Sequence, residues 1–432
     1  MQGSPKAAWS LCAGPYVKSS VRLCLIFGLL FCSYQVIRQG IGAWYFRQGV
    51  PDAVQTAIRW DSGDPEYFDA LAAFRHFYAD TGNPDDIVSA CETATRLSPN
   101  NAYYWADLGA AYDWSGNSNN AIRAFERARK LFPNSPDINW QLANFYVRAG
   151  MTSQAVLALR KVLQGDSAAR RQALKLATSA MYDTHLILDE MLPVREGILL
   201  EYLDVLIATN NLDAAEQVWA RLLEFNLPFD PRRVFSYFDA LVQHHEVGRA
   251  ALMWAALAQR FPEQIQPLAQ DGEQITNGNF DFDIVNGGFD WRVMPVEGAA
   301  ISVDSLNSFE GGRSLRIDFD GMHNLEFYHV FQYVLIKPNT RYRFSGSARV
   351  KGISSDSGPR FQIFDAYDTR VLFSSSSNMV GSSEWLTQQL EFKTGADSQL
   401  LIIRVARPAS RKFDNRIAGT AWVCKIHLKS LE

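Results

Sequence analysis

Apolar residues recur at helical spacing through the middle of the chain, from about Asp52 to Gln270. In one stretch three of them fall on a single helical face, namely Trp105, Leu108 and Tyr112. Ser115-Gly116-Asn117 then interrupts the pattern. A second face follows, formed by Ala121, Phe125 and Ala128 and ended by Pro133. The pattern predicts two helices joined by a tight turn. Gly109, inside the first helix, costs about 1 kcal/mol relative to alanine, so we expect another backbone to approach it closely.

The same spacing recurs on both sides of this hairpin. The matching positions are Leu71, Phe74, Tyr78, Ile87, Cys91 and Pro99 before it, and Leu142, Ala143, Tyr146, Ala155 and Leu159 after it. Two later sets are Tyr202, Leu203, Leu206, Ala215 and Trp219, and then Tyr237, Phe238, Leu241, Ala250, Trp254 and Pro262. Residues 165–193 fit poorly and are interpreted as a degenerate unit or an irregular pair of helices. Because one hairpin cannot bury its apolar face alone, we expect a stack of them.

The hairpin with Trp105 spells W-x-x-L-G-x-x-Y, then A-x-x-x-F-x-x-A and a closing proline. This resembles the tetratricopeptide repeat, which has a period of about 34 residues. The resemblance implies an all-α superhelix over residues 52–270 that serves as an interaction surface. It also implies a concave groove, lined by the first helix of each hairpin, that holds a protein partner.

Carried onto this chain, the resemblance places two groups of residues in that groove. They are Tyr103, Ala106, Ala110, Asp113 and Trp114 from one repeat, and Asp137, Trp140, Asn144 and Arg148 from the next. We take Tyr103, Asp113, Trp114, Trp140, Asn144 and Arg148 as the candidate protein-binding residues, because aromatic and arginine side chains commonly anchor interfaces. The alternative is that they cover a neighbouring helix or residues near the membrane.

The N-terminal region, residues 1–50, contains a continuous apolar run from Leu23 to Ile37. Arg38 interrupts it, and Ile41 to Phe46 is apolar again. We interpret this region as an uncleaved, single-pass membrane anchor, with a secretory signal or a buried helix of the first repeat as alternatives. Lys6, Lys18 and Arg22 favour an inside N-terminus. The bulk of the chain would then lie outside the cytoplasm, in the periplasm or at the cell surface if the source is bacterial.

The pattern changes near Asp271 to short alternating runs broken by glycine-, asparagine- and proline-rich turns. Runs of this kind predict an all-β sandwich over residues 273–432. Several segments resemble carbohydrate-binding jelly rolls of the galactose-binding-like fold, often attached to xylanases and cellulases. They are Ile275–Phe280, Gly287–Trp291, Gly311–Leu315, Gln332, Lys337–Tyr342, Trp385 and Gly419–Trp422. Trp291 and Trp422 are expected in the core.

The resemblance implies a glycan site on one sheet face, because sugar rings stack on aromatic side chains and need polar partners. Candidates are Tyr328, His329, Gln362, Phe364, Tyr367 and Arg404. Strand alternation predicts that Tyr328 and His329 point to opposite faces, so we keep Tyr328, Gln362, Phe364 and Arg404. Alternatively, the sandwich only packs against the repeats or a partner protein.

The family's closing strand usually carries acidic residues that help hold calcium, but here Val423-Cys424-Lys425 stand in that place. Asp281, Asp283 and Asp290 could supply some ligands, although turn carboxylates are the simpler interpretation. We therefore expect no metal site and no cofactor.

Charge and chemistry narrow the function further. The net charge is −4 and the sequence shows no basic patch of the kind that tracks phosphates, so we expect no nucleic-acid partner. The five cysteines suggest no disulfide framework, and Cys91 is expected to be a buried apolar group.

No phosphate loop, HExxH or G-x-S-x-G motif is present, and His244-His245 suits a solvated helix end. Glu326 and Asp365 are a possible carboxylate pair for a glycosidase, but nothing in the sequence indicates a shared pocket.

These features predict a membrane-anchored, non-enzymatic adaptor with no catalytic residues. Its repeats recruit a protein, and its sandwich contacts a polysaccharide, as would suit surface polysaccharide assembly or export. The alternatives are a structural assembly protein that binds no sugar and a cryptic carbohydrate-active enzyme.

Overall fold

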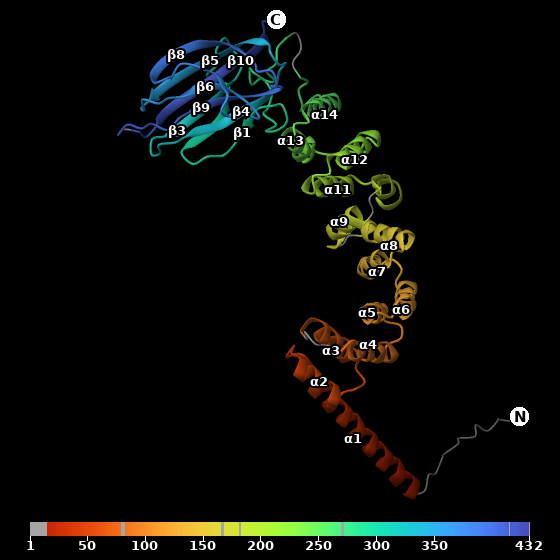
Figure 1. Cartoon of the computed structure of the whole chain (residues 1–432). Coiled ribbons are helices and arrows are strands. Elements are labelled where there is room, and N and C mark those ends of the chain that lie inside the picture. The colour runs from red at the N-terminus through yellow and green to blue at the C-terminus, as the bar shows by residue number, and fades with distance from the viewer. Residues whose placement is uncertain are drawn as a thin grey trace, which may run out of the picture. The chain divides into compact units, whose positions relative to one another are not determined.

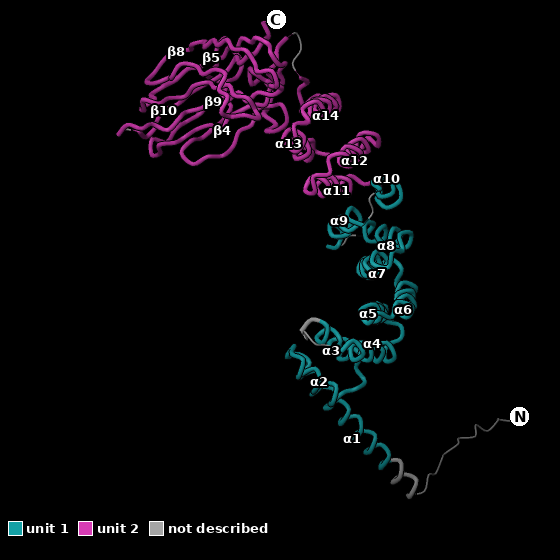
Figure 2. The backbone as a smooth tube through the Cα atoms, viewed as in Figure 1, with its two compact units in different colours: residues 1–193 teal, residues 194–432 magenta. Residues whose placement is uncertain are grey.

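The computed structural model describes residues 15–78, 83–165, 168–180, 183–268, 272–413 and 415–431. The chain divides into two compact units, residues 1–193 and residues 194–432 (Figure 2). Gln270 and Asp271, where the helical pattern is predicted to give way to strands, lie outside the described residues. The boundaries 52–270 and 273–432 therefore stay a prediction.

The first unit is helical (Figure 1). Its helices are α1 (Pro15–Phe46), α2 (Pro51–Trp60), α3 (Pro65–Tyr78), α4 (Pro84–Leu97), α5 (Ala102–Trp114), α6 (Ser118–Leu131), α7 (Pro136–Arg148), α8 (Thr152–Gln164), α9 (Arg170–Ala180) and α10 (Thr184–Leu186). A π-helical turn, Ile187–Met191, follows α10. Consecutive helices pair as hairpins, so the predicted repeat-like stack is confirmed. The poorly matching segment 165–193 contributes only α9, the single turn α10 and the π-helical turn among its described residues.

Side chains just before several of these helices cap their N-termini, and a glycine allows one of the turns between them. The side chains of Asn83, Asn101, Asn117 and Ser135 accept hydrogen bonds from backbone N–H groups at the starts of α4 to α7. Gly116 allows the turn between α5 and α6, with φ of +79°. Gly109 lies against the ring of Phe125, and a Cβ there would sit 2.8 Å from it. The expectation of a backbone neighbour at this glycine is therefore wrong, because the group that approaches it closely is an aromatic side chain.

Helix α1 is long and apolar enough to cross a membrane, with a mean hydropathy of 1.4 over Arg22–Phe46. A signal sequence would pass the same test. The end of α1 packs on the next two helices, because Arg38 forms an ion pair of 3.1 Å with Asp61 and Phe46 contacts Tyr67 at 4.8 Å. Of the basic residues in the predicted topology signal, Lys6 and the side chain of Lys18 lie outside the described part of the chain.

The second unit begins with two more hairpins (Figure 1). They consist of α11 (Glu196–Ala208), α12 (Leu212–Glu224), a 3-10 turn (Pro231–Val234), α13 (Phe235–Gln243) and α14 (Val247–Arg260). The strands are β1 (Arg292–Val293), β2 (Ala299–Asp304), β3 (Ser314–Asp320), β4 (Phe327–Leu335), β5 (Arg341–Ile353), β6 (Arg360–Asp365), β7 (Leu372–Ser375), β8 (Gly381–Lys393), β9 (Leu400–Arg407) and β10 (Ala418–Ser430).

The strands form two five-stranded antiparallel sheets, in the orders β1-β4-β9-β6-β7 and β2-β3-β10-β5-β8. Alternate residues of the two sheets, such as Phe344 and Phe361, meet in the core at a ring distance of 5.2 Å. Trp291 lies in the core, as expected. Trp422 is also buried, but the side chains of Arg316 and Arg349 cover its ring. The predicted all-β sandwich is confirmed.

The last helical hairpin packs against the sandwich within the second unit. Phe289 lies 4.8 Å from Phe238 of α13 and 6.1 Å from Trp254 of α14, measured between ring centroids. A Cβ on Gly288 would lie 1.9 Å from the Trp254 ring, so only glycine fits that approach. The Tyr367 hydroxyl donates to the Val242 carbonyl at 2.9 Å. Ring contacts and a hydrogen bond thus join the hairpin to the sandwich.

Candidate binding surfaces

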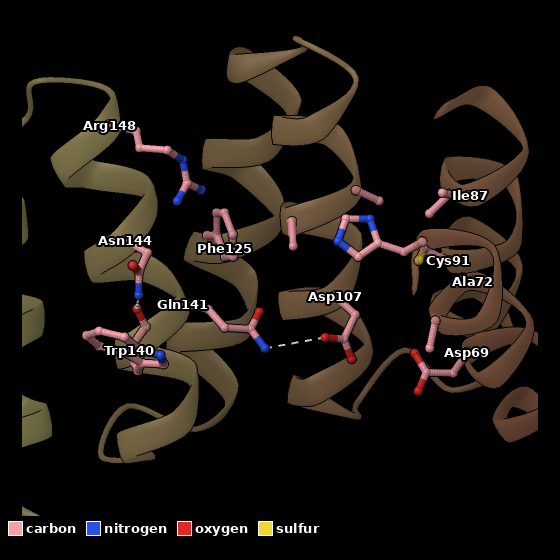
Figure 3. A pocket seen from close by; sticks show the side chains of 14 residues that line it. Asp69, Ala72, Ile87, Cys91, Asp107, Phe125, Trp140, Gln141, Asn144 and Arg148 are labelled. Carbon is pink, nitrogen blue, oxygen red and sulfur yellow. Dashed lines mark hydrogen bonds between the residues drawn. The ribbon is translucent and has the colours of Figure 1, made fainter. Parts of the chain in front are cut away.

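A hollow of about 380 Å³ runs across the first helices of three successive hairpins (Figure 3). Helices α3, α5 and α7 supply most of its wall, while α4 and α6 supply part of its floor. The lining residues are Asp69, Ala72, Ala73, His76, Ile87, Cys91, Asp107, Ala110, Ala111, Phe125, Trp140, Gln141, Asn144 and Arg148. We call this hollow the repeat groove. Four of the lining residues are alanines, and their small side chains leave the space open.

Two carboxylates, Asp69 from α3 and Asp107 from α5, reach into the groove (Figure 3). Burial, the nearby charge of Asp107 and a hydrogen bond with the Asp107 side chain together raise the pKa of Asp69 to about 7. Burial also raises the pKa of Asp107. Near neutral pH the pair therefore tends to share one proton. Gln141 of α7 donates to Asp107 Oδ1 at 3.4 Å.

The structure brings four of the six predicted groove residues to one end of the groove. Trp140, Asn144 and Arg148 line it, and Asp113 is held there by an ion pair of 2.5 Å with Arg148. Trp114 lies beside the lining, with its ring edge-on to His76 at 5.4 Å.

Tyr103 is not among the lining residues and instead faces Phe132, at the end of α6, at a ring distance of 6.4 Å.

Sequence reasoning missed the polar centre of the groove, formed by Asp69, Asp107 and Gln141. A signal existed, because Asp107 and Gln141 are 34 residues apart and so occupy the same position in successive repeats. Asp69 lies one helical turn before the equivalent position in the preceding repeat, Ala73, so the period alone does not find it.

The outer face of the sheet β1-β4-β9-β6-β7 gathers the four residues chosen as a sugar site. The Arg404 guanidinium lies 4.3 Å from the centroid of the Phe364 ring and 5.8 Å from that of Tyr328. Its Nε and Nη2 donate to Gln362 Oε1 at 3.2 and 3.0 Å. We call this group the aromatic platform. Its residues come from β4, β6 and β9, which pair directly through β9.

The prediction that Tyr328 and His329 face opposite sides is wrong. Their rings stack at 4.8 Å with an interplanar angle of 15°. The register of β4 shifts between Phe327 and Val330, and such an irregularity cancels the simple alternation of side chains. His329 therefore lies beside the aromatic platform. Tyr367, another early candidate, is half-buried and stacks on His245 of the helical hairpin at 3.8 Å.

Three of the five carboxylates considered for calcium or catalysis have separate structural partners. Asp283 pairs with Arg313 at 3.0 Å, and buried Asp290 accepts a hydrogen bond from the Val285 N–H at 2.8 Å. Burial raises the pKa of Asp290 to about 6. Asp365 accepts from the Ser398 hydroxyl at 2.5 Å. Among the residues described by the structure, no three His, Cys, Asp or Glu side chains gather as a metal site would require.

The chain is similar to known proteins in two of its regions. The tetratricopeptide repeat family model matches residues 115–177. A search of curated proteins finds no match. Among solved structures, a CBM4 structure is 14% identical, with a TM-score of 0.28, and the match covers 36% of this chain and 99% of that one.

Two further solved structures resemble this chain. The CBM22-1 xylan-binding domain from Paenibacillus barcinonensis Xyn10C is 15% identical, covers 38% of this chain and 98% of its own, and has a TM-score of 0.26. MamA is 20% identical, covers 30% of this chain and 77% of its own, and also has a TM-score of 0.26. The family-model match fits tetratricopeptide repeats in the helical region.

Proposed function

We propose that the chain is a membrane-anchored, non-enzymatic adaptor whose repeat groove binds a segment of a partner protein. The observation that carries this proposal is the acidic centre of the groove, formed by Asp69 and Asp107. Tetratricopeptide repeats are units of protein–protein interaction, and this chain matches that family at residues 115–177. The carboxylates in the groove add to that general role a preference for a partner segment with a basic side chain.

The segment that suits the groove carries a basic side chain. Asp69 and Asp107 have no basic side chain within ion-pair distance in the part of the chain described, and the nearby Arg148 pairs with Asp113. Gln141 Oε1 is also buried without a hydrogen-bond partner among the described residues. An ammonium group has three donors, and these three side chains offer it acceptors. It would displace the proton shared by the carboxylates.

The remaining lining residues suit the rest of such a segment. Trp140 offers a flat surface, and Ile87, Cys91 and Phe125 offer an apolar floor. Arg148 and Asn144 lie at the far end of the groove, where backbone carbonyls of an extended peptide could accept hydrogen bonds.

The experiment is a binding titration of the detergent-solubilised full chain with labelled peptides that contain either lysine or norleucine at the central position. We expect the lysine peptide to bind more tightly, and its affinity to rise between pH 6 and 8 as the shared proton becomes easier to displace. Asp69→Asn together with Asp107→Asn should remove the preference for lysine. Asp85→Asn, on the exposed first turn of α4 and outside the groove lining, is the matched control.

Equal affinity for the two peptides would overturn the proposed chemistry. So would a preference for lysine that survives the double substitution.

We also propose that the aromatic platform binds a glycan. Tyr328 and Phe364 offer ring faces for sugar stacking, and Gln362 and Arg404 offer polar groups for hydroxyls. A glycan array probed with the full chain tests this proposal. If no sugar binds, the adaptor becomes a structural assembly protein, and if a polysaccharide is cleaved, the protein is an enzyme.

The proposed location follows from α1. With α1 held in a bilayer, residues after about 50 would lie outside the cytoplasm, where a glycan ligand is accessible. Resistance of the full chain to extraction from membranes by alkaline carbonate, and protease access from outside intact cells, test the anchor and its direction. Surface polysaccharide assembly or export is the process that would use a protein with these two binding surfaces.

A further inference from the structure

A second hollow, of about 850 Å³, lies between the second helices of two successive hairpins, α6 and α8. It is lined by Glu126, Arg129, Lys130, Pro133, Asn139, Leu157, Ala158, Arg160, Lys161 and Gln164. None of these residues lines the repeat groove. We call this hollow the basic hollow.

Four cations and one carboxylate surround the basic hollow. Lys161 donates to Asn134 Oδ1 at 3.2 Å. Arg129, Lys130 and Arg160 are exposed and have no ion-pair partner among the described residues. Residues 118–164 hold seven basic and two acidic side chains, although the whole chain has a net charge of −4. The positive charge is therefore concentrated in this part of the chain.

The order of residues along the chain does not reveal this basic surface. Arg129-Lys130 and Arg160-Lys161 are separate pairs near helix ends, and each alone is an ordinary favourable charge at a helix C-terminus. The repeat stack brings the two pairs to one hollow. Four positive charges around one hollow repel each other, and this repulsion lowers the stability of the stack. Favourable charge at the helix ends does not require the two pairs to lie this close, so we expect an anionic ligand that offsets the repulsion.

The lining decides which anion fits. Nucleic acid and sugar are commonly held by stacking on aromatic side chains, and the lining contains none. A bilayer surface contacts protruding groups and does not enter a hollow. Leu157, 56% exposed, together with Pro133 and Ala158 provides an apolar floor among the cations. An acidic peptide that also carries an apolar side chain matches both features.

We propose that the basic hollow docks an acidic segment of a partner protein, with carboxylates on Arg129, Lys130 and Arg160 and an apolar side chain on Leu157. This surface is independent of the repeat groove, which prefers a basic side chain. The chain would therefore hold two segments of opposite charge on separate surfaces of the same repeats.

The test is fluorescence anisotropy of the detergent-solubilised full chain with a labelled peptide that alternates Asp and Glu around a central Leu. We expect Lys130→Glu combined with Arg160→Glu to weaken binding about tenfold or more, since each reversal replaces attraction by repulsion. Arg96→Glu combined with Arg123→Glu is the matched control, because both residues are exposed on second helices and neither lines the hollow. Circular dichroism would verify the fold of both variants, and Arg160→Gln, a milder change, should weaken binding less.

Unchanged affinity of the Lys130→Glu/Arg160→Glu variant would overturn the proposal. Equal weakening by the control pair would also overturn it, because net charge alone would then explain binding. Tighter capture of vesicles rich in anionic lipid, or of a polyuronate, than of the peptide would assign the surface to another ligand and overturn it too. Binding of the lysine peptide to the repeat groove should be the same in all these variants, which separates this test from that of the proposed function.

Discussion

The carboxylate of Asp239 on α13 accepts hydrogen bonds from both terminal nitrogens of Arg292 on β1, at 3.2 and 2.5 Å. The Arg292 guanidinium also lies 5.1 Å from the centroid of the Tyr333 ring. A single side chain thus joins the last helical hairpin to the sandwich sheet that bears the aromatic platform. Together with the Phe289 contact, it makes the hairpin part of the sandwich fold.

Loss of this ion pair should lower stability modestly. Asp239→Asn removes the charge but keeps the shape, and Asp239 is half exposed, so we expect a cost of about 1 kcal/mol. Differential scanning fluorimetry should show a fall of roughly 2–4 °C in the melting temperature of the second unit. Asp368→Asn is the control, because its partner Arg370 is exposed and only two residues away. An equal effect of both substitutions would argue against a special role for Asp239.

Gly288 is the most sensitive position at the same contact. Gly288→Ala places a methyl group against the Trp254 ring and keeps a φ of +57°, which L-residues disfavour. We expect destabilisation of about 2–4 kcal/mol from overpacking and backbone strain together. Gly197→Ala, in open space on α11, should be neutral or slightly stabilising in the same chemical denaturation experiment. A tolerated Gly288→Ala would mean that hairpin and sandwich do not pack as described.

The Asp69–Asp107 pair should make stability depend on pH. The folded-state pKa of Asp69, about 7, lies above its ordinary value of 3.8, so the folded protein holds a proton that the unfolded chain releases. This contribution is complete below about pH 4 and is lost as pH rises through 7. The groups whose charge raises this pKa are Asp107 and Glu66.

We therefore expect the melting temperature of the native chain to fall between pH 5 and 8 by more than that of Asp69→Asn. At pH 8 the variant should be the more stable protein, because it buries no charge at this site. Asp52→Asn, on an exposed helix start, should leave the pH dependence unchanged. Identical pH profiles for the native chain and Asp69→Asn would show that the pair does not share a proton.

The aromatic platform gives a prediction for any sugar that the full chain binds. Tyr328→Ala removes a 43% exposed ring and should weaken binding roughly tenfold or more, as loss of an interface anchor does. Arg404→Ala should also weaken binding, since Arg404 contacts Tyr328, Phe364 and Gln362 together. Phe413→Ala removes a fully exposed aromatic ring elsewhere on the sandwich and serves as the control in isothermal titration calorimetry. Binding that resists both platform substitutions would place the sugar site elsewhere.

Periodicity in the sequence predicted the helical stack and the sandwich, because each depends on patterns within one element. The cost of glycine in a helix indicated a close neighbour at Gly109, but not that it is an aromatic side chain. Contacts between residues of different helices or strands are harder to predict from the sequence. Asp69 and Asp107 meet although they occupy different positions in their repeats, and the two basic pairs meet only once hairpins stack. A register shift in β4, invisible in the residue pattern, brings Tyr328 and His329 together.

The ion pair between Arg38 of α1 and Asp61 after α2 has a mechanical consequence. It links the final turns of α1 to the first hairpin. The apolar helix therefore joins the repeats without a flexible linker. With α1 embedded in lipid, the first binding helices would stand at a fixed height and could not swing freely. Partners would then have to come to the membrane surface to be caught.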